Sequence, residues 1–517
     1  MSMLPSWAMD AMNILTQAFI LAVGLAVLIG FFMYVADITQ TRDAVRRNYP
    51  LFGRFRSLFT TLGEFFRQYF FAMDREELPF NRAERDWVYR SSEGKGGTIP
   101  FGSTKPMDKP GTAIFVNCPF PLLDDHAAET RPMRIGPQAR TPYDAPSFFN
   151  ISGMSYGALS KPAVRALSRG AAKAGIWMNT GEGGLSPMHL EGGCDIVFQI
   201  GTAKYGVRNA EGGLSDSNLR KMAAHEQVRM FELKLSQGAK PGKGGILPAE
   251  KVTRDIAAIR GIPVGQESIS PNRHPEFDDI GGLLDMIGHI REVTGKPVGF
   301  KAVIGAYGWL EEMCEEITKR GPQSAPDFFT IDSGDGGTGA APMALMDNVG
   351  LTIRESLPIA VTIFERYGLK DRVRIIASGK LLTPGSVAWA LAAGADFIQC
   401  GRGFMFSLGC IQALKCHQNT CPTGVTTHKK SLQRGLVVRD KAERVAVYAD
   451  TVRKHVEMIA HSCGVPEPRR LGRKHVRIVQ TSGRSLPMTA LDFLPDDDTP
   501  NRLTPVGSGA RDLPEQP

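Results

Sequence analysis

The stretch "DFFTIDSGDGG", residues 327–337, is a short apolar run that ends in a glycine-rich turn. The same texture recurs between residues 148 and 403 in "FFNISG", "IWMNTGEGG", "IVFQIG", "MFELKLSQGAKPG", "VGFKAVIG", "VRIIASGK" and "DFIQCGRG". Amphipathic segments such as "PAVRALSRGAAKAG" and "PGSVAWALAAG" separate several of the runs. Strand-like runs that alternate with helices over about 260 residues predict a (β/α)8 TIM barrel of the α/β class, with a doubly wound sheet as the alternative.

The six residues "GDGGTG", 334–339, match the G-x-G-x-x-G pattern of dinucleotide-binding folds. The match is weak, because it follows the sixth run instead of the first and Pro342 comes only three residues after its last glycine. The acidic residue that such a site needs about 20 residues further on is also missing, since Glu355 comes too early. We therefore interpret this segment as a turn at the barrel rim.

The last two runs end in "ASGK" and "CGRG", residues 377–380 and 400–403. Barrels of this kind often bind a phosphate between the loops that follow strands seven and eight, where glycine lets backbone N–H groups approach the anion. Tight turns without a ligand are the alternative. The residues suited to a phosphate are Ser378, Gly379, Gly401, Arg402 and Gly403.

Charged residues interrupt or end several runs that are otherwise apolar. Lys234 and Lys301 lie inside such runs, and Glu182 lies between two glycines at the end of another. A barrel strand is covered on both faces, so a lysine there must reach solvent at the strand end or meet an anion. These positions predict either a ligand site at the rim or a structural ion pair.

Residues 12–36, "MNILTQAFILAVGLAVLIGFFMYVA", contain no charged side chain. As a helix they would extend about 37 Å, enough to cross a bilayer. The run is long for a signal peptide and has no basic residue before it, whereas arginines follow at 42, 46, 47, 54 and 56. The positive-inside rule then predicts a single-pass inner-membrane anchor that leaves the rest of the chain in the cytoplasm. The aromatic, basic stretch after it predicts a helix that packs on the protein or the membrane surface.

The net charge of +8 is concentrated beside this segment and around residues 469–477, without a zinc-finger, helix-turn-helix or aromatic-basic pattern. Nucleic acid is therefore not an expected partner. Three of the eight cysteines, Cys410, Cys416 and Cys421, are separated by gaps of five and four residues. Because cytoplasmic proteins rarely keep disulfides, the triplet indicates a metal site, either an iron–sulfur cluster or zinc with His417 or His428.

Four segments, "TGEGG", "FELKLSQGAKPGKGGILP", "DSGDGGTGAAP" and "LGCIQALKCHQNTCPTGV", together resemble the FMN-binding synthase domain of glutamate synthase, in the order of that family and over about residues 117–434. The resemblance implies a barrel with FMN and a three-iron four-sulfur (3Fe-4S) cluster held by the cysteine triplet. It implies reductive amination, in which FMNH2 delivers hydride to an imine of 2-oxoglutarate and ammonia to give L-glutamate. Ferredoxin or a reductase subunit would supply the electrons.

The resemblance also assigns roles to individual residues. Glu182, Lys234 and Lys240 correspond to residues near the flavin and the 2-oxo acid. The positions expected around FMN are Ser152, Gly153, Gln199, Lys301, Gly337, Ser378, Gly379, Gly401 and Arg402.

The chain departs from the family pattern at two points. Ile246 stands where the family has a glutamine for 2-oxoglutarate, and "SGDGGTG" lacks the usual histidine. A membrane helix also stands where an amidotransferase domain would begin. These differences leave two alternatives open, a related FMN oxidoreductase acting on a different amine or 2-oxo acid, and a non-catalytic electron-transfer subunit.

The sequence predicts four regions. They are an anchor at 1–40, a membrane-proximal and barrel-entry segment at 41–145, the FMN-binding barrel with its iron–sulfur loop at 146–435, and a C-terminal helical extension and tail at 436–517.

Overall fold

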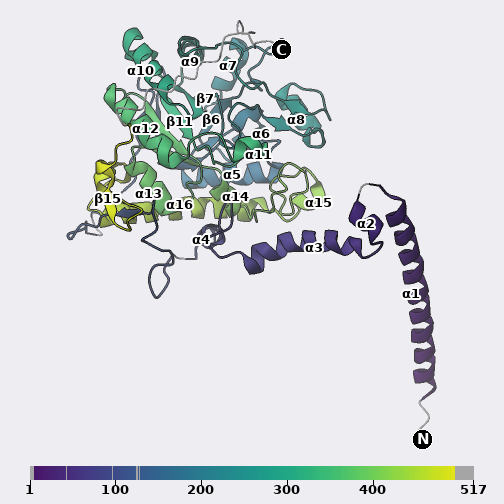
Figure 1. The fold of residues 1–517 in the computed structure, drawn as a ribbon. Coiled ribbons are helices and arrows are strands. Elements are labelled where there is room, and N and C mark those ends of the chain that lie inside the picture. The colour runs from purple at the N-terminus through teal and green to yellow at the C-terminus, as the bar shows by residue number, and fades with distance from the viewer. Residues whose placement is uncertain (1–4, 42, 96, 124–125, 127–128, 495–517) are drawn as a thin grey trace, which may run out of the picture. The chain divides into compact units, whose positions relative to one another are not determined.

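The computed structural model describes the chain except for residues 1–4, 42, 96, 124–125, 127–128 and 495–517 (Figure 1). The predicted C-terminal tail lies largely outside the described residues. The chain divides into two compact units, Met1–Ala83 and Glu84–Pro517.

The first unit is helical. Helix α1 (Ser6–Thr39) is followed by α2 (Ala44–Asn48) and by α3 (Gly53–Phe66), which continues as one π-helical turn, η1 (Arg67–Phe71). The apolar side chains of α1 are exposed along its length, and no part of its most apolar stretch is buried within the protein. By length and composition α1 could cross a membrane, although a signal sequence would meet the same criteria.

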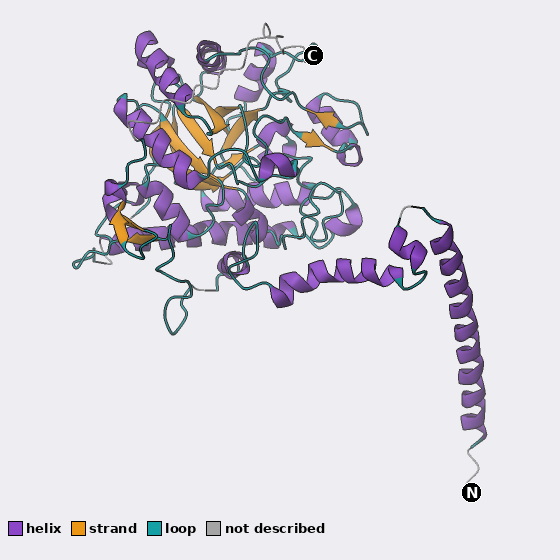
Figure 2. Ribbon diagram, in the orientation of Figure 1, coloured by secondary structure: helices purple, strands orange, loops and turns teal. Residues whose placement is uncertain are grey.

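The second unit contains a closed eight-stranded parallel barrel, which confirms the predicted (β/α)8 fold (Figure 2). All eight runs identified in the sequence supply its strands. In barrel order these are β4 (Phe149–Ile151), β5 (Met178–Asn179), β6 (Ile196–Ile200), β7 (Val228–Lys234), β10 (Val298–Val303), β11 (Phe328–Asp332), β12 (Arg374–Ser378) and β13 (Phe397–Cys400).

Helices connect the successive strands. Helix α5 shows why these segments are helical: the Ser160 side chain accepts a hydrogen bond from the Ala163 N–H at 3.3 Å, and Gly175 ends the helix with a φ of +62°. The connecting helices are α5 (Lys161–Ala174), α6 (Pro187–Leu190), α7 (Asp216–Ala223), α8 (Arg254–Arg260), α9 (Ile280–Thr294), α10 (Gly308–Arg320), α11 (Met343–Met346), α12 (Ile353–Arg366) and α13 (Pro384–Ala392). Helix α14 (Arg402–Ser407) follows the last barrel strand.

Segments outside the barrel pack against its helices and its N-terminal end. After α15 (Lys430–Gln433), the long helix α16 (Val438–Ser462) packs on α5, where a Cβ on Gly170 would lie 2.5 Å from the Val445 side chain. Helix α4 (Arg82–Ser92) lies at the start of the unit. The small antiparallel strands are β1 (Ala113–Phe115), β14 (Val476–Val479) and β15 (Ser485–Pro487) in one sheet, β2 (Met133–Ile135) with β3 (Tyr143–Ala145), and β8 (Ile246–Leu247) with β9 (Ser268–Ile269).

The β2–β3 hairpin closes the N-terminal end of the barrel. Its buried residues Ile135, Tyr143 and Ala145 belong to one apolar cluster with side chains from the barrel strands. The barrel strands contribute Val197, Met230, Phe328, Ile376 and Phe397 to this cluster. Trp177, which directly precedes β5, also belongs to it. The apolar core therefore fills the lower barrel and leaves the opposite end for polar residues.

Candidate active site

The inward face of the barrel changes from apolar to polar toward the C-terminal rim. Because side chains alternate along a strand, the residues two positions beyond the apolar cluster point inward as well. They form a polar level of Asn179, Gln199, Glu232, Thr330, Ser378 and Gln399, and each is at least nine-tenths buried. Two positions further are Gly181, Gly201, Lys234, Asp332, Lys380 and Gly401, so glycines and charged residues form the rim.

Glu232 is the centre of the polar level. Its side chain is fully buried, and its Oε1 accepts hydrogen bonds from Asn179 Nδ2 at 2.8 Å and Gln199 Nε2 at 2.6 Å. Its Oε2 accepts one from Thr330 Oγ1 at 2.6 Å. Three donors from three strands thus compensate the desolvation of the carboxylate. The Asn179 and Gln199 amides are oriented by this acid, with their nitrogen atoms toward it.

An acid–lysine pair lies at the rim directly above. Lys234 Nζ is 2.9 Å from Glu182 Oε2 and donates to Gln237 Oε1 at 2.8 Å. Burial alone would raise the pKa of Glu182, but the cations of Lys234, Lys240 and Arg260 lower it to about 2. Burial lowers the pKa of Lys234 to about 8, against the opposing effect of Glu182. The pair is the ionic contact that the sequence left open as an alternative, and the further cations Lys240 and Arg260 near Glu182 give the rim an excess of positive charge.

Two further buried lysines contribute to this excess. Lys301 is paired in register with Lys234 across β10 and β7 and is 3% exposed. Within the described part of the chain its ammonium group makes no hydrogen bond or ion pair. Lys240 is 6% exposed, on the loop after β7. A buried cation without a protein partner is costly, so the rim is suited to an anionic ligand.

Glycines at the rim bring the backbone close to neighbouring groups. A Cβ on Gly153 would lie 3.3 Å from Asn179 Oδ1, and one on Gly337 would lie 2.8 Å from Arg402 Nε. Gly379 has a φ of +110°, a conformation that favours glycine. The neighbouring Ser152 N–H donates to the Cys400 carbonyl, which ties β4 to β13.

The predicted phosphate residues separate into two groups. Ser378, Gly379 and Gly401 lie at adjacent strand ends, as expected for a shared anion site. Gly403 has a packing reason instead, because a Cβ there would lie 2.1 Å from the Tyr448 hydroxyl of α16. The role of Gly403 in binding therefore has the weakest structural basis of the set.

Arg402 links the rim to the cysteine triplet. Its Nη2 donates to the Thr338 carbonyl, and its Nη1 lies 4.0 Å from Cys416 Sγ. Buried Lys251 donates to the Cys416 carbonyl at 2.9 Å. Two cations thus lie beside thiols that would carry negative charge as metal ligands.

The three thiols have different surroundings. Burial raises the pKa of the Cys410 thiol to about 11; Arg402 opposes this shift and the other two thiols add to it. Burial would also raise the pKa of Cys421, but hydrogen bonds with Thr423 and Thr426 lower it. Among the residues that the structure describes, no three His, Cys, Asp or Glu side chains are arranged to hold a metal ion. The triplet therefore fits a thiolate-bound cluster by its donor chemistry and charge, and not by a preformed geometry.

Sequence reasoning missed Glu232, Asn179, Gln399 and Lys251. Gln399 is fully buried on β13, and neither atom of its amide has a hydrogen-bond partner within the described residues. An orphaned amide of this kind fits a ligand with hydrogen-bonding edges, such as a flavin. The alternation of "FIQCG", in which Gln399 shares a face with Phe397 and Gly401, was the available signal.

The family model and the curated relatives agree on one family. The conserved region in glutamate synthase matches residues 125–466. The glutamate synthase large subunit-like protein YerD of Bacillus subtilis is 39% identical over 508 residues, which covers 90% of this chain and 96% of YerD. The archaeal glutamate synthase (NADPH) of Methanocaldococcus jannaschii is 35% identical over 298 residues, covering 57% of this chain and 55% of that protein. A solved structure of the flavin-binding domain of baker's yeast flavocytochrome b2 has a TM-score of 0.44 and 13% identity, covering 80% of this chain and 82% of its own.

Proposed function

The chain belongs to the glutamate synthase family, and on that premise we propose that it is a membrane-anchored FMN and iron–sulfur oxidoreductase. Its proposed reaction is the reductive amination of 2-oxoglutarate to L-glutamate. The observation that carries this proposal is the rim of the barrel, where the buried lysines Lys234, Lys240 and Lys301 gather and only Lys234 forms an ion pair, with Glu182, within the described residues. Such a surplus of buried cations suits a bound anionic flavin and a dicarboxylic substrate.

FMN is proposed to bind along the strand ends. Ser378, Gly379, Gly401 and Arg402 would contact its phosphate, and Ser152, Gly153, Gln199 and Gly337 would border its ring. Lys301 would supply a positive charge beside the ring. The Gln399 amide, which has no hydrogen-bond partner within the described residues, would gain one there. When bound, FMN supplies the hydride for the reaction.

The substrate is proposed to bind above Lys234 and Lys240. Their ammonium groups would each pair with a carboxylate of the 2-oxo acid. Glu182 holds Lys234 at 2.9 Å and so fixes the position of this donor before any ligand arrives. The rigid pair lowers the cost of ordering the substrate, which is the basis of preorganised binding.

A 3Fe-4S cluster is proposed to be held by Cys410, Cys416 and Cys421. Lys251 and Arg402 would offset the negative charge of the three thiolates. A cluster of this kind transfers electrons one at a time. Ferredoxin or a reductase subunit is the proposed donor.

The apolar helix α1 is proposed to anchor the protein in the cell inner membrane, with the barrel in the cytoplasm. The exposed apolar surface of α1 and the arginines that follow it support this arrangement. The lipid bilayer is then a permanent partner of the chain.

Ile246 favours a second candidate, a related reaction with another amine or 2-oxo acid. A Cβ on the preceding residue, Gly245, would lie 2.4 Å from Glu182 Oε1, so Ile246 follows a backbone segment that approaches the rim acid. An isoleucine side chain offers no hydrogen bond to a carboxylate. The distal end of the acceptor could therefore be apolar.

An anaerobic optical experiment tests the assignment. The detergent-purified full chain is reduced, and 2-oxoglutarate and ammonium are added singly and together while the flavin band at about 450 nm is followed. Reoxidation that needs both additions supports glutamate formation. Reoxidation only by another 2-oxo acid or amine supports the second candidate, and no reoxidation by any pair contradicts both. Iron and FMN content are measured on the same sample.

A further inference from the structure

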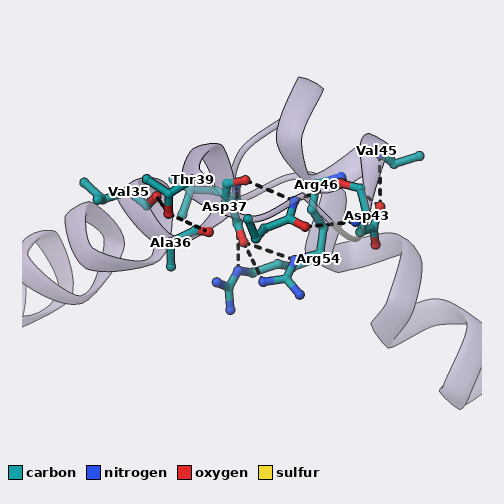
Figure 3. Close-up of polar contacts among 10 residues, drawn as sticks. Val35, Ala36, Asp37, Thr39, Asp43, Val45, Arg46 and Arg54 are labelled. Carbon is teal, nitrogen blue, oxygen red and sulfur yellow. Dashed lines mark hydrogen bonds and ion pairs between the residues drawn. The ribbon is translucent and has the colours of Figure 1, made fainter.

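A buried acid joins the end of α1 to the two helices after it. The Asp37 side chain is fully buried, and its Oδ1 accepts from Arg46 Nη2 at 2.6 Å (Figure 3). Its Oδ2 accepts from Arg54 Nε at 2.8 Å and from the Leu51 N–H at 3.1 Å. The two arginines belong to α2 and α3, so one carboxylate holds three helices together.

Polar contacts in the turn between α1 and α2 reinforce this junction. Gln40 Nε2 donates to the carbonyls of Asp37 and Asp43, at 3.1 and 2.8 Å. Asp43 Oδ1 accepts from the N–H groups of Val45 and Arg46 and so caps α2 (Figure 3). The chain is thus held in a defined bend directly after α1.

The helix held by this bend carries an exposed aromatic stripe, which consists of Phe52, Phe55, Phe59, Phe66 and Phe70. Their spacing places them on one face of α3 and η1. Phe52, Phe59 and Phe70 are 76%, 64% and 69% exposed. Neighbouring rings also lie against each other. The ring centroids are 6.5 Å apart for Phe52 and Phe55, 6.3 Å for Phe55 and Phe59, and 5.6 Å for Phe66 and Phe70. Exposed aromatic side chains gathered on one face in this way are unusual on a surface in contact with water.

The charge of the segment identifies what covers the stripe. Residues 40–71 contain six arginines and two acidic residues. With about 100° of rotation per residue of an α-helix, Arg56 and Arg67 lie along one edge of the stripe. Thr61 lies about 200° from Phe59 and is therefore on the opposite face of the helix. Aromatic side chains bordered by arginines match the headgroup layer of an anionic membrane, where rings enter the acyl boundary and cations meet phosphates.

We propose that α3 and η1 lie in the headgroup layer of an anionic lipid membrane, with the aromatic stripe facing the acyl chains, and that the Asp37 cluster holds them in this position. The inference rests on the proposed anchoring by α1, because the same membrane must be present at the end of that helix. It adds a second, surface-lying contact to the anchor.

Tryptophan quenching tests this position in the full chain. Phe59→Trp and, as the matched control, Thr61→Trp are made in a Trp7→Phe background, which removes the tryptophan of α1. Each variant is reconstituted into phosphatidylcholine–phosphatidylglycerol vesicles whose acyl chains carry bromine, and flotation establishes that the protein is in the membrane. We expect bromine to quench the Phe59→Trp emission several-fold more than that of Thr61→Trp.

The outcomes separate this inference from the anchor. Equal, weak quenching of both variants in protein that floats would overturn the inference and leave the anchor intact. Protein that does not float would overturn the anchor and this inference with it. If the Phe59→Trp emission were quenched as strongly in vesicles of phosphatidylcholine alone as in phosphatidylcholine–phosphatidylglycerol vesicles, the assignment to anionic lipid would be overturned.

A second pair of variants tests the Asp37 cluster. Asp37→Asn weakens both arginine contacts and is expected to reduce the difference in quenching between the two reporter positions. Asp10→Asn removes a charge from the exposed start of α1 and is expected to leave it unchanged. An unchanged difference in Asp37→Asn would remove the positioning role of the cluster.

Discussion

Glu232 offers the sharpest test of the barrel interior. Replacing it with leucine would leave three donors without an acceptor, namely Asn179 Nδ2, Gln199 Nε2 and Thr330 Oγ1. An unsatisfied buried donor costs about 1–3 kcal/mol, and the Thr330 hydroxyl can rotate away, so Glu232→Leu should lower the free energy of unfolding by about 3–5 kcal/mol.

The isosteric change Glu232→Gln is the matched variant. Its oxygen can still accept from Asn179 and Gln199, and its nitrogen can donate to Thr330 Oγ1, so the change removes the charge assistance and the one hydrogen bond that the Thr330 hydroxyl donates. The expected destabilisation is about 1–2 kcal/mol. Urea unfolding of the full chain in detergent, followed by tryptophan fluorescence, gives the ranking. If leucine destabilised no more than glutamine, the reasoning that the three donors need Glu232 would be wrong.

Three further predictions follow from packing and charge. Gly170→Ala should destabilise the protein because its Cβ has no space beside α16, whereas Gly288→Ala on α9, with no atom near its Cβ, should be neutral or stabilising; thermal unfolding compares the two. Binding of a 2-oxo acid should weaken as the pH rises through about 8, because Lys234 then loses its proton, and calorimetric titration across that range measures it. Burial lowers the pKa of His189 and His274 to about 4, below the unfolded value of 6.5. Both therefore contribute stability above pH 6.5 that is lost as the pH falls toward 4, by at most about 3 kcal/mol each. Urea unfolding at several pH values measures this loss, and a free energy of unfolding that does not change between pH 6.5 and 4 would contradict it.

The barrel could be predicted because its signal is local. Each strand ends in glycine, and the alternation within a run such as "MFELK" shows which residues share a face. The sequence analysis singled out Lys234 in this run, and the same alternation puts Glu232, two residues earlier, on the same face. Its importance was not visible, because its partners Asn179 and Gln199 come from other strands and depend on the register between them.

Long-range contacts account for the other omissions. Lys251 reaches the Cys416 carbonyl across 165 residues of sequence, and no spacing rule predicts such a contact. The junction around Asp37 is similar, since a lone acid at the end of an apolar helix has meaning only once Arg46 and Arg54 fold back onto it. Sequence pattern therefore locates the faces of elements, and the structure is needed to establish which charges meet.

The choice of acceptor can be tested at Ile246. Ile246→Gln introduces an amide directly after Gly245, the residue on which a Cβ would lie 2.4 Å from Glu182 Oε1. A hydrogen bond from this amide to a carboxylate of the substrate would contribute about 1.5–3 kcal/mol, which corresponds to roughly 10- to 100-fold in affinity. We expect this variant to bind 2-oxoglutarate more tightly, and a 2-oxo acid with an apolar side chain less tightly, than the natural chain does. Ile246→Leu keeps the apolar surface and should change neither affinity by much.

The two ligands must be compared in the same variants, because affinity for either one alone could change through a general effect on the loop. A gain for 2-oxoglutarate with a loss for the apolar acid would place the distal end of the substrate at Ile246. Parallel changes for both ligands would contradict that placement. In that case the specificity of the site would depend on the fixed cations Lys234 and Lys240, which bind any 2-oxo acid through its carboxylate, and not on the residue that follows Gly245.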